Sequence, residues 1–301
     1  MNHQPRIATV GMFDGVHRGH RALLDRLRRE ASVRGASPVV FTFDRHPLAH
    51  IAPERAPGAL MTVSDKVDAL KSAGIEDIEV LHFDEKLRSL TARQFLTMLH
   101  DDFGITALLM GFNHRFGSDR LDDLMQYEAI GQEIGIEIVR ADELRDPVEL
   151  SRAICSSSIR EAIAEGDVTA AAKMLGRPFA LRGKVVHGRQ LGRTIGFPTA
   201  NIEPSESALL VPRRGVYAVD VVLPGGDRRR GMLNIGVRPT VDNSARPAPS
   251  VEVYIIDWHG DLYDKEIELE FIQRLRDERR FSGLDALRRQ LALDLEETKS
   301  L

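Results

Sequence analysis

The sequence RIATVGMFDGVHRGHRALLDRLRREA at residues 6–31 joins a short apolar run to a helical pattern through a loop rich in glycine and histidine. Arg6–Val10 has the apolar character of a β-strand. Leu23, Leu24 and Leu27 then recur at the spacing of one helix face. A strand that leads through a loop into a helix is typical of the first half of a βαβ unit, so this segment predicts a parallel sheet.

The same alternation continues to about residue 140. The expected strands are Ser37–Phe43, Ile78–Phe83, Thr106–Phe112 and Ile136–Arg140, and the expected helices lie around Ser64–Ala73, Ala92–Asp101 and Asp122–Ile134. Strands that alternate with helices predict an α/β doubly wound parallel sheet. Such sheets bind ligands at the carboxyl ends of their strands, where the loop after Val10 lies.

The chain changes character near residue 178. Ser156–Leu175 has a helical pattern, which Gly176 and Pro178 interrupt. Short β-like runs follow, separated by turns rich in glycine and proline, and they predict a small antiparallel β-barrel with a C-terminal helix. The runs are Ala180–Val186, Gly215–Leu223, Gly231–Ile235, Val251–Asp257 and Glu266–Phe271. We therefore expect two domains, 1–178 and 179–301.

Four leucines repeat along one face of that last helix, and we expect them to pack in the core. They are Leu284, Leu287, Leu291 and Leu295.

Composition and charge exclude several classes of protein. The 301 residues include 41 Lys and Arg and 45 Asp and Glu, so the net charge is −4. That balance argues against a nucleic-acid binder, although a few local cations suffice for a small phosphorylated ligand. Cys155 is the one cysteine, which rules out a disulfide framework and a multi-cysteine zinc site. With neither a membrane-length apolar run nor a signal-peptide core, we expect a cytoplasmic protein with no membrane partner and no evident obligate protein partner.

The loop at residues 11–20 has the features of a phosphate site. Glycine lets the backbone approach a ligand closely, and a helix N-terminus offers free N–H groups to an anion. His17 and His20 are three residues apart, so on a helical turn they face the same way. Two imidazoles there suit a polyphosphate whose charge grows during transfer. A metal pair or incidental polar surface is the alternative, and two histidines alone make a poor zinc site.

The segment GMFDGVHRGH at residues 11–20 resembles the nucleotidyltransferase signature of bacterial FAD synthetases, which are bifunctional riboflavin kinases and FMN adenylyltransferases. Phe41–Pro47, Gly111–Gly117 and Ile154–Arg160 resemble the family's later adenylyltransferase motifs, in the same order. The resemblance implies a nucleotidyltransferase-like, Rossmann-type first domain in which His17, His20 and Arg160 stabilise the transferring group. The nucleotide-binding residues that it implies are Gly11, Phe13, Asp14, Gly15, Asn113, Ser156 and Ser157.

The chain departs from the commoner family pattern at a few positions. They are Arg45, where many members have proline, His114, where many have phenylalanine, and Cys155 and Ser157, which replace serine and threonine. Two of the implied contacts also have a plainer interpretation. Ser156–Arg160 fits a helix cap followed by a surface arginine, a role that can coexist with phosphate binding. Asn113 fits a turn.

The segment from Gly183 to Asn201 is similar to the riboflavin-kinase core. The resemblance implies that Thr199 and Asn201 bind Mg²⁺ and the ATP phosphates, and that Gly183, Lys184 and Gly188 also contact the nucleotide. A hydroxyl and an amide carbonyl supply the oxygen ligands that Mg²⁺ prefers. A glycine-rich hairpin with an asparagine turn is the alternative.

Glu252 lies in the apolar run Val251–Tyr254, where a lone carboxylate would ordinarily face solvent. The resemblance implies instead that Glu252 is the catalytic base, and it leaves open the role of Tyr254, where many members have histidine. The segment at 231–240 resembles the next block of the kinase, and the segment at 275–281 resembles a C-terminal block that the family uses near the flavin. The resemblance implies flavin contacts from Asn234, Arg276 and Phe281. A charged helix face is the alternative for the second block.

Together these motifs imply an enzyme that phosphorylates riboflavin to FMN with ATP and Mg²⁺. The enzyme then adenylylates FMN to FAD with a second ATP and releases pyrophosphate. Two alternatives are an enzyme with only the kinase activity and a flavin-binding regulator whose catalysis has decayed. The presence of His17, His20 and Arg160 argues against the first, and Thr199, Asn201 and Glu252 argue against the second.

Overall fold

The computed structural model describes residues 5–111, 115–141, 154–188, 192, 195–237 and 249–301. The chain divides into two compact units, Met1–Ser151 and Arg152–Leu301. Among the described residues, no helix combines the length and the apolar character needed to cross a membrane.

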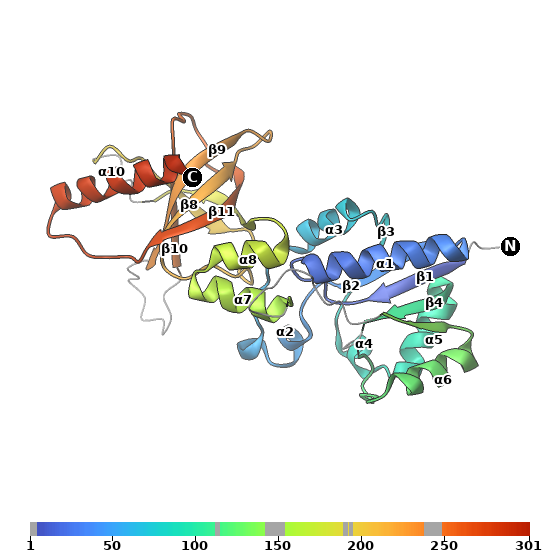
Figure 1. Ribbon diagram of the computed structural model, residues 1–301. Coiled ribbons are helices and arrows are strands. Elements are labelled where there is room, and N and C mark those ends of the chain that lie inside the picture. Colours follow the sequence, from blue (N-terminus) through green and yellow to red (C-terminus); the bar gives the residue numbers. More distant parts are fainter. Residues whose placement is uncertain (1–4, 112–114, 142–153, 189–191, 193–194, 238–248) are drawn as a thin grey trace. The chain divides into compact units, whose positions relative to one another are not determined.

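The first unit is a five-stranded parallel sheet with the strand order β3-β2-β1-β4-β5 (Figure 1). Its strands are β1 (Arg6–Val10), β2 (Ser37–Phe43), β3 (Asp77–Leu81), β4 (Ile105–Met110) and β5 (Glu137–Arg140). Its helices are α1 (Arg18–Arg34), α2 (Pro47–Ile51), the 3₁₀ helix η1 (Pro53–Arg55), α3 (Val63–Ser72), α4 (Glu85–Ser89), α5 (Ala92–Phe103) and α6 (Leu124–Ile134). The predicted doubly wound sheet is confirmed, while the short helices α2, η1 and α4 were not predicted.

Helices cover both faces of this sheet (Figure 1). Successive strand residues point to opposite faces, so Ile7 packs in a core with α1 and α3, whereas Ala8 packs in a second core with α5 and α6. The first core contains Leu24 and Leu27, as the helical spacing predicts. A parallel sheet with both faces buried is the arrangement that the near-continuous apolar strands require.

The strand order reverses beside β1, because the chain passes from β1 to β2 and β3 and then returns to β4 on the other side of β1. Open α/β sheets bind ligands in the crevice at such a reversal, beyond the carboxyl ends of the strands. The loop after Val10 begins at this edge, as does the segment after Met110. The fold therefore brings Gly11 and Gly111, the first residues of the first and third adenylyltransferase-like motifs, to one edge of the sheet.

The second unit is a closed six-stranded antiparallel barrel with the strand order β10-β7-β6-β11-β8-β9 (Figure 1). Its strands are β6 (Phe179–Val186), β7 (Ala200–Pro204), β8 (Gly215–Val222), β9 (Arg228–Val237), β10 (Pro249–Ile255) and β11 (Glu266–Arg276), and its helices are α7 (Ser156–Glu165), α8 (Val168–Leu175) and α10 (Leu284–Ser300). The predicted barrel and terminal helix are confirmed. Strand β7 was not predicted, because only Ile202 of its five residues is buried and no apolar alternation marks it.

Alternation along β10 shows how the barrel is filled. Val251, Val253 and Ile255 are buried, whereas Glu252 and Tyr254 between them are partly exposed on the outer surface. Helix α8 packs against β6 and β11, and α10 packs against β8 and β9. The helices α7 and α8 thus belong to the same compact unit as the barrel. A functional boundary near residue 178 stays a prediction.

The expectation that the leucines of α10 pack in the core is wrong. Leu284 is 63% exposed, and Leu287 and Leu291 line a cavity. The interior of the barrel is already filled by strand side chains, so a helix added to it can only cover part of the outer surface. The buried residues of α10 are instead Asp294 and Thr298.

Candidate functional site

The loop after β1 is a strained turn. Phe13, Gly15 and Val16 have φ angles of 47°, 84° and 38°. A positive φ is ordinary for glycine but costly for a β-branched residue such as Val16. The backbone N–H of Val16 donates to the carbonyl oxygen of Phe13 at 3.0 Å, and both side chains are buried in the core. Strain of this kind persists where the surroundings fix the conformation, and it is found at ligand sites.

This turn places His17 and His20 side by side. His17 caps α1, and its Nδ1 accepts a hydrogen bond from the backbone N–H of His20 at 3.2 Å. The two imidazole rings stack with 3.6 Å between their centroids. The Nδ1 of His20 is shielded from solvent and has no hydrogen-bond partner in the part of the chain that the structure describes. A shielded polar atom without a partner is a position where a ligand can bind.

Burial, the neighbouring His17 and the charge of Lys66 hold the pKa of His20 well below its usual value of 6.5. His20 is therefore neutral at pH 7. Lys66 lies on α3 with only 5% of its surface exposed, and its Nζ donates to the carbonyl oxygens of Met12 at 3.3 Å and Phe43 at 2.6 Å. Sequence reasoning missed this lysine, because a single lysine on an amphipathic helix looks like a solvent-facing residue.

The other residues implied for this site have different roles in the fold. A Cβ at Gly11 would lie 3.0 Å from the ring of Phe13, so glycine allows this close packing. The Asp14 carboxylate accepts hydrogen bonds from the backbone N–H of Leu60 at 3.0 and 3.2 Å, which fastens the loop to the segment before α3. Phe13 is 1% exposed, so its ring is part of the core and a nucleotide contact there stays a prediction. Asn113 and His114 lie outside the described residues.

In the second motif, Phe41–Pro47, the Asp44 carboxylate makes the main polar contacts. Arg45, the departure from the family pattern, pairs with the Asp44 carboxylate at 3.2 Å. Burial raises the pKa of Asp44, but hydrogen bonds from the backbone of Phe83, from His82 and from Arg45 outweigh it and lower the pKa overall. The carboxylate therefore stays charged and holds β2 and β3 together at their carboxyl ends.

The Ser-rich motif forms the start of α7. Cys155, not Ser156, is the cap, and its Sγ accepts from the backbone N–H of Ser158 at 3.5 Å. Burial raises the pKa of the Cys155 thiol, but hydrogen bonds from Ser158 and the backbone of Ser157 and the charge of Arg160 lower it overall. Ser156, Ser157 and Arg160 belong to the second unit, so their approach to His17 and His20 stays a prediction.

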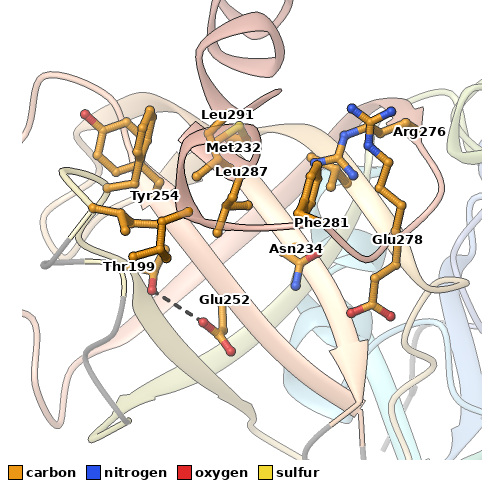
Figure 2. A pocket seen from close by; sticks show the side chains of 16 residues that line it. Thr199, Met232, Asn234, Glu252, Tyr254, Arg276, Glu278, Phe281, Leu287 and Leu291 are labelled. Carbon is orange, nitrogen blue, oxygen red and sulfur yellow. Dashed lines mark hydrogen bonds between the residues drawn. The ribbon is translucent and has the colours of Figure 1, made fainter. Parts of the chain in front are cut away.

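A cavity of about 430 Å³ lies on the outer surface of the barrel, under α10 (Figure 2). Strands β8, β9 and β10 form one wall, and the segment after β11 together with α10 forms the other. The lining residues are Gly192, Ile195, Phe197, Thr199, Val216, Met232, Asn234, Glu252, Tyr254, Arg276, Glu278, Arg279, Phe281, Leu284, Leu287 and Leu291.

Glu252 is the centre of this site. In the strand register it lies opposite Asn201 on β7 and opposite Asn234 on β9. Residues directly opposite one another in a sheet share a face, so the three side chains form one row across the outer surface. The hydroxyl of Thr199 donates to the Glu252 carboxylate at 3.5 Å (Figure 2). The structure thus brings Glu252, Thr199, Asn201 and Asn234 together, as the sequence predicts.

The oxygen atoms of this row fit a magnesium ion. Thr199 and Asn201 offer a hydroxyl oxygen and an amide oxygen, and Mg²⁺ takes such oxygen ligands together with substrate phosphates. A Cβ at Gly188 would lie 2.1 Å from the Asn201 amide nitrogen, so only glycine leaves the amide its space. Among the described residues, no group of three His, Cys, Asp or Glu side chains could hold a metal ion.

Two further residues implied for nucleotide binding serve the barrel itself. A Cβ at Gly183 would lie 2.5 Å from the carbonyl oxygen of Glu203, so glycine allows β6 and β7 to pair closely. The ammonium group of Lys184 pairs with Asp264 at 2.8 Å, and this contact raises the pKa of Lys184. Nucleotide contacts at both positions stay predictions.

Asn234, Arg276 and Phe281, the residues implied for the flavin, all line the cavity. Asp294 of α10 binds the Arg276 guanidinium, with N···O distances of 2.6 to 3.0 Å. Sequence reasoning missed Asp294, because an aspartate in a leucine-striped helix is usually solvent-facing. It also left open the role of Tyr254, whose ring meets the edge of Phe197 with 5.2 Å between centroids.

The fold of the whole chain has a solved counterpart. A crystal structure described as a macrolide-efflux protein from Streptococcus pneumoniae matches with a TM-score of 0.86 and 32% sequence identity, over 100% of this chain and 96% of that one. The two chains share both units of the fold. The word efflux belongs to the description of that protein, and it assigns no activity to this chain.

Two family models match this chain, one described as FAD synthetase over residues 1–158 and one described as riboflavin kinase over residues 175–301. The bifunctional riboflavin kinase/FMN adenylyltransferase of Escherichia coli (strain K12) is 37% identical over 96% of this chain and 90% of that protein. The protein of the same description from Pseudomonas fluorescens is 37% identical over 99% and 94%, and that from Bacillus subtilis (strain 168) is 33% identical over 97% and 90%. With two family models and such relatives along nearly its whole length, this chain belongs to the bifunctional riboflavin kinase/FMN adenylyltransferases, the enzymes that make FMN and FAD.

Proposed function

We propose that the cavity beside β10 binds riboflavin and that Glu252 is the general base of its phosphorylation. The observation that carries this proposal is the row of Asn201, Glu252 and Asn234 on the outer surface of the barrel, with Thr199 bonded to the carboxylate. A volume of about 430 Å³ falls in the range of small-molecule sites. The apolar wall of α10 suits a flat aromatic ring, and the polar row suits a sugar-like hydroxyl chain.

In the kinase reaction, the Glu252 carboxylate accepts the proton of the ribityl 5′-hydroxyl while that oxygen attacks the γ-phosphorus of ATP. The bond from this phosphorus to the bridging oxygen of ADP breaks, which gives FMN and ADP. Thr199 and Asn201 are the residues that would hold Mg²⁺, which when bound offsets the charge of the phosphates. Gly183, Lys184 and Gly188 are proposed to contact the same nucleotide.

In the adenylyltransferase reaction, an FMN phosphate oxygen attacks the α-phosphorus of a second ATP, and pyrophosphate leaves without a covalent enzyme intermediate. Neutral His20 and its partner His17 stabilise the charge on the transferring group by donating hydrogen bonds, and Arg160 adds a positive charge. The side chain of Asp14 and the backbone of Phe13 hold the loop against the nucleotide. The remaining proposed nucleotide contacts are Gly11, Gly15, Asn113, Ser156 and Ser157.

We propose that the two activities divide along the chain as 1–178 for adenylyl transfer and 179–301 for the kinase. The family models support this, because they match 1–158 and 175–301. The helices α7 and α8 belong to the same compact unit as the barrel, but α7 carries the Ser-rich motif proposed for the first activity. We also propose that the enzyme works in the cytoplasm, a reducing compartment that suits a chain with a single cysteine.

One assay tests the proposal. Purified protein is incubated with riboflavin, ATP and Mg²⁺, and the flavins are separated. We expect the parent protein to form both FMN and FAD. Glu252→Gln should form FAD from supplied FMN but no new FMN. Neither product should form when a chelator is present. FMN alone from the parent would favour an enzyme with only the kinase activity, and neither product would favour a flavin-binding regulator.

A further inference from the structure

The most buried side chains of α10 are polar. Asp294 is 2% exposed and Thr298 is fully buried, whereas the leucines of the helix face the cavity or solvent. A carboxylate is costly to bury unless it is paired and hydrogen-bonded. Thr298 donates its hydroxyl to the backbone carbonyl of Asp294 and not to the carboxylate, so a cation that neutralises the carboxylate must come from another side chain.

Arg276, the last residue of β11, supplies that partner. Its Nε lies 3.0 Å from both carboxylate oxygens of Asp294, and its Nη2 donates to one of them at 2.6 Å. Its Nη1 donates to the backbone carbonyl of Asp277 at 3.1 Å. Two parallel charge-assisted bonds fix both distance and orientation, so the pair ties α10 to the end of β11. Each of the three guanidinium nitrogens of Arg276 thus makes at least one hydrogen bond within the protein.

The pair is part of a larger network that also holds Phe281. Gln290 donates to the Asp294 carboxylate at 2.6 Å and accepts from Arg279. The guanidinium groups of Arg276 and Arg279 lie 5.8 and 5.1 Å from the centroid of the Phe281 ring, close enough for cation–π attraction. Figure 2 shows Phe281 and Arg276 at the end of the cavity away from Thr199 and Tyr254.

We infer that Asp294 is a positioning residue of the riboflavin kinase site, which through Arg276 holds α10 and Phe281 in place as the wall of the cavity. The inference rests on the proposed assignment of this cavity to riboflavin. In the part of the chain that the structure describes, helix α10 packs on β8 and β9 beside the cavity and is joined to the end of β11 through Arg276, so a break in the pair loosens the wall that the flavin packs on. Arg276 and Asp294 then act as one unit.

A double-mutant cycle tests this with Asp294→Asn, Arg276→Met and the double variant. We expect each single variant to raise the riboflavin KM by about 10-fold to 100-fold with kcat unchanged. The double variant should be no worse than the worse single one, because each change removes the same interaction. Glu296→Gln, an exposed carboxylate on the same helix, is the matched control. Adenylyl transfer from supplied FMN and a thermal melt show that each variant is folded.

Different results identify different failures. The inference would be overturned if Arg276→Met raises the riboflavin KM while Asp294→Asn keeps the KM of the parent, because Arg276 would then act on the flavin directly. Additive effects in the double variant would also overturn it. Glu252→Gln is measured in parallel, and a parent kcat there would overturn the cavity assignment itself. If Asp294→Asn does not fold, Gln290→Met removes one donor to the same carboxylate, and an unchanged KM in that variant would count against the inference.

Discussion

The imidazole rings of His17 and His20 lie nearly parallel, 16° apart, and the backbone N–H of His20 donates to the Nδ1 of His17. Because that nitrogen accepts, a neutral His17 in this arrangement carries its proton on Nε2. The strained turn at Phe13–Val16 holds both rings at the N-terminus of α1, where free backbone N–H groups add to the attraction for an anion. This fixed arrangement supports the proposal that the pair binds a phosphate group.

Replacing His20 by alanine should slow adenylyl transfer from ATP to FMN by about 100-fold to 1000-fold, the usual effect of removing one preorganised donor. His20→Asn keeps a donor and should lose less. Riboflavin phosphorylation should stay at the parent rate in both variants, as should both reactions in the control His259→Ala, which changes an exposed histidine of the second unit. The measurements are the two half-reactions and elemental analysis. A normal adenylylation rate in His20→Ala would refute the assignment, and a stoichiometric transition metal lost with the histidine would favour a metal site.

The low pKa of His20 makes the free energy of unfolding depend on pH. Burial, His17 and Lys66 lower the pKa in the folded state, whereas in the unfolded chain it returns to about 6.5. Below pH 6.5 the unfolded state binds more protons than the folded state, so stability is lost as the pH falls from 6.5 toward the folded pKa. Above pH 6.5 this contribution is constant. Thermal melts from pH 8 to pH 5 should show a smaller decline for His20→Asn than for the parent, and identical declines would contradict the shift.

Most of the fold could be predicted because apolar periodicity marks its main elements. The central parallel strands β1, β2 and β4 are nearly continuous apolar runs, and barrel strands such as β10 alternate between buried and partly exposed residues. Strand β7 lacks this signal. It is a strand because it pairs with β6 and β10, and its own side chains show no apolar alternation. The leucine spacing correctly predicted the helix α10, but the prediction that these leucines pack in the core was wrong. Periodicity identifies an apolar face without identifying what covers it.

The two candidate sites could be predicted unequally. His17 and His20 are close in sequence, so helical spacing alone places them together, whereas Glu252 and Asn234 meet only through strand register. Lys66 and Asp294 could not be found from the sequence, because each looks like an ordinary surface charge. Burial of a charge depends on partners distant in sequence, and here these are the carbonyl groups around the first loop and the guanidinium at the end of β11.

Replacing Thr199 by alanine removes the hydroxyl that donates to Glu252 and should reduce riboflavin phosphorylation by about 100-fold or more. Asn201→Asp should also remove kinase turnover, because it changes the neutral amide of the proposed Mg²⁺ site into a second carboxylate. Adenylylation of supplied FMN should survive in both, since none of the residues proposed for that reaction lies in the strands of the barrel. Ser205→Ala, an exposed hydroxyl just after β7, is the matched control. Loss of both activities in a folded variant would contradict two separate sites.

The last prediction concerns where the kinase part of the chain begins. Helix α8 packs on β6 and β11 through buried side chains that include Val168 and Met174, and the backbone N–H of Arg213 donates to the carbonyl of Ile163 at 3.2 Å. We expect fragments 152–301 and 179–301 both to phosphorylate riboflavin and neither to adenylylate FMN. The shorter fragment should melt at a temperature lower by about 5 °C or more, because it exposes the barrel surface that the helices cover.

Melting curves and riboflavin phosphorylation by the two fragments decide between the boundaries. Equal melting temperatures would show that α7 and α8 add nothing to the barrel. An inert or insoluble 179–301 beside an active 152–301 would move the start of the kinase part to the division at Ser151. It would also mean that the helix bearing Arg160 is folded by the kinase barrel, so that the adenylyltransferase activity depends on the second unit for one of its cationic groups.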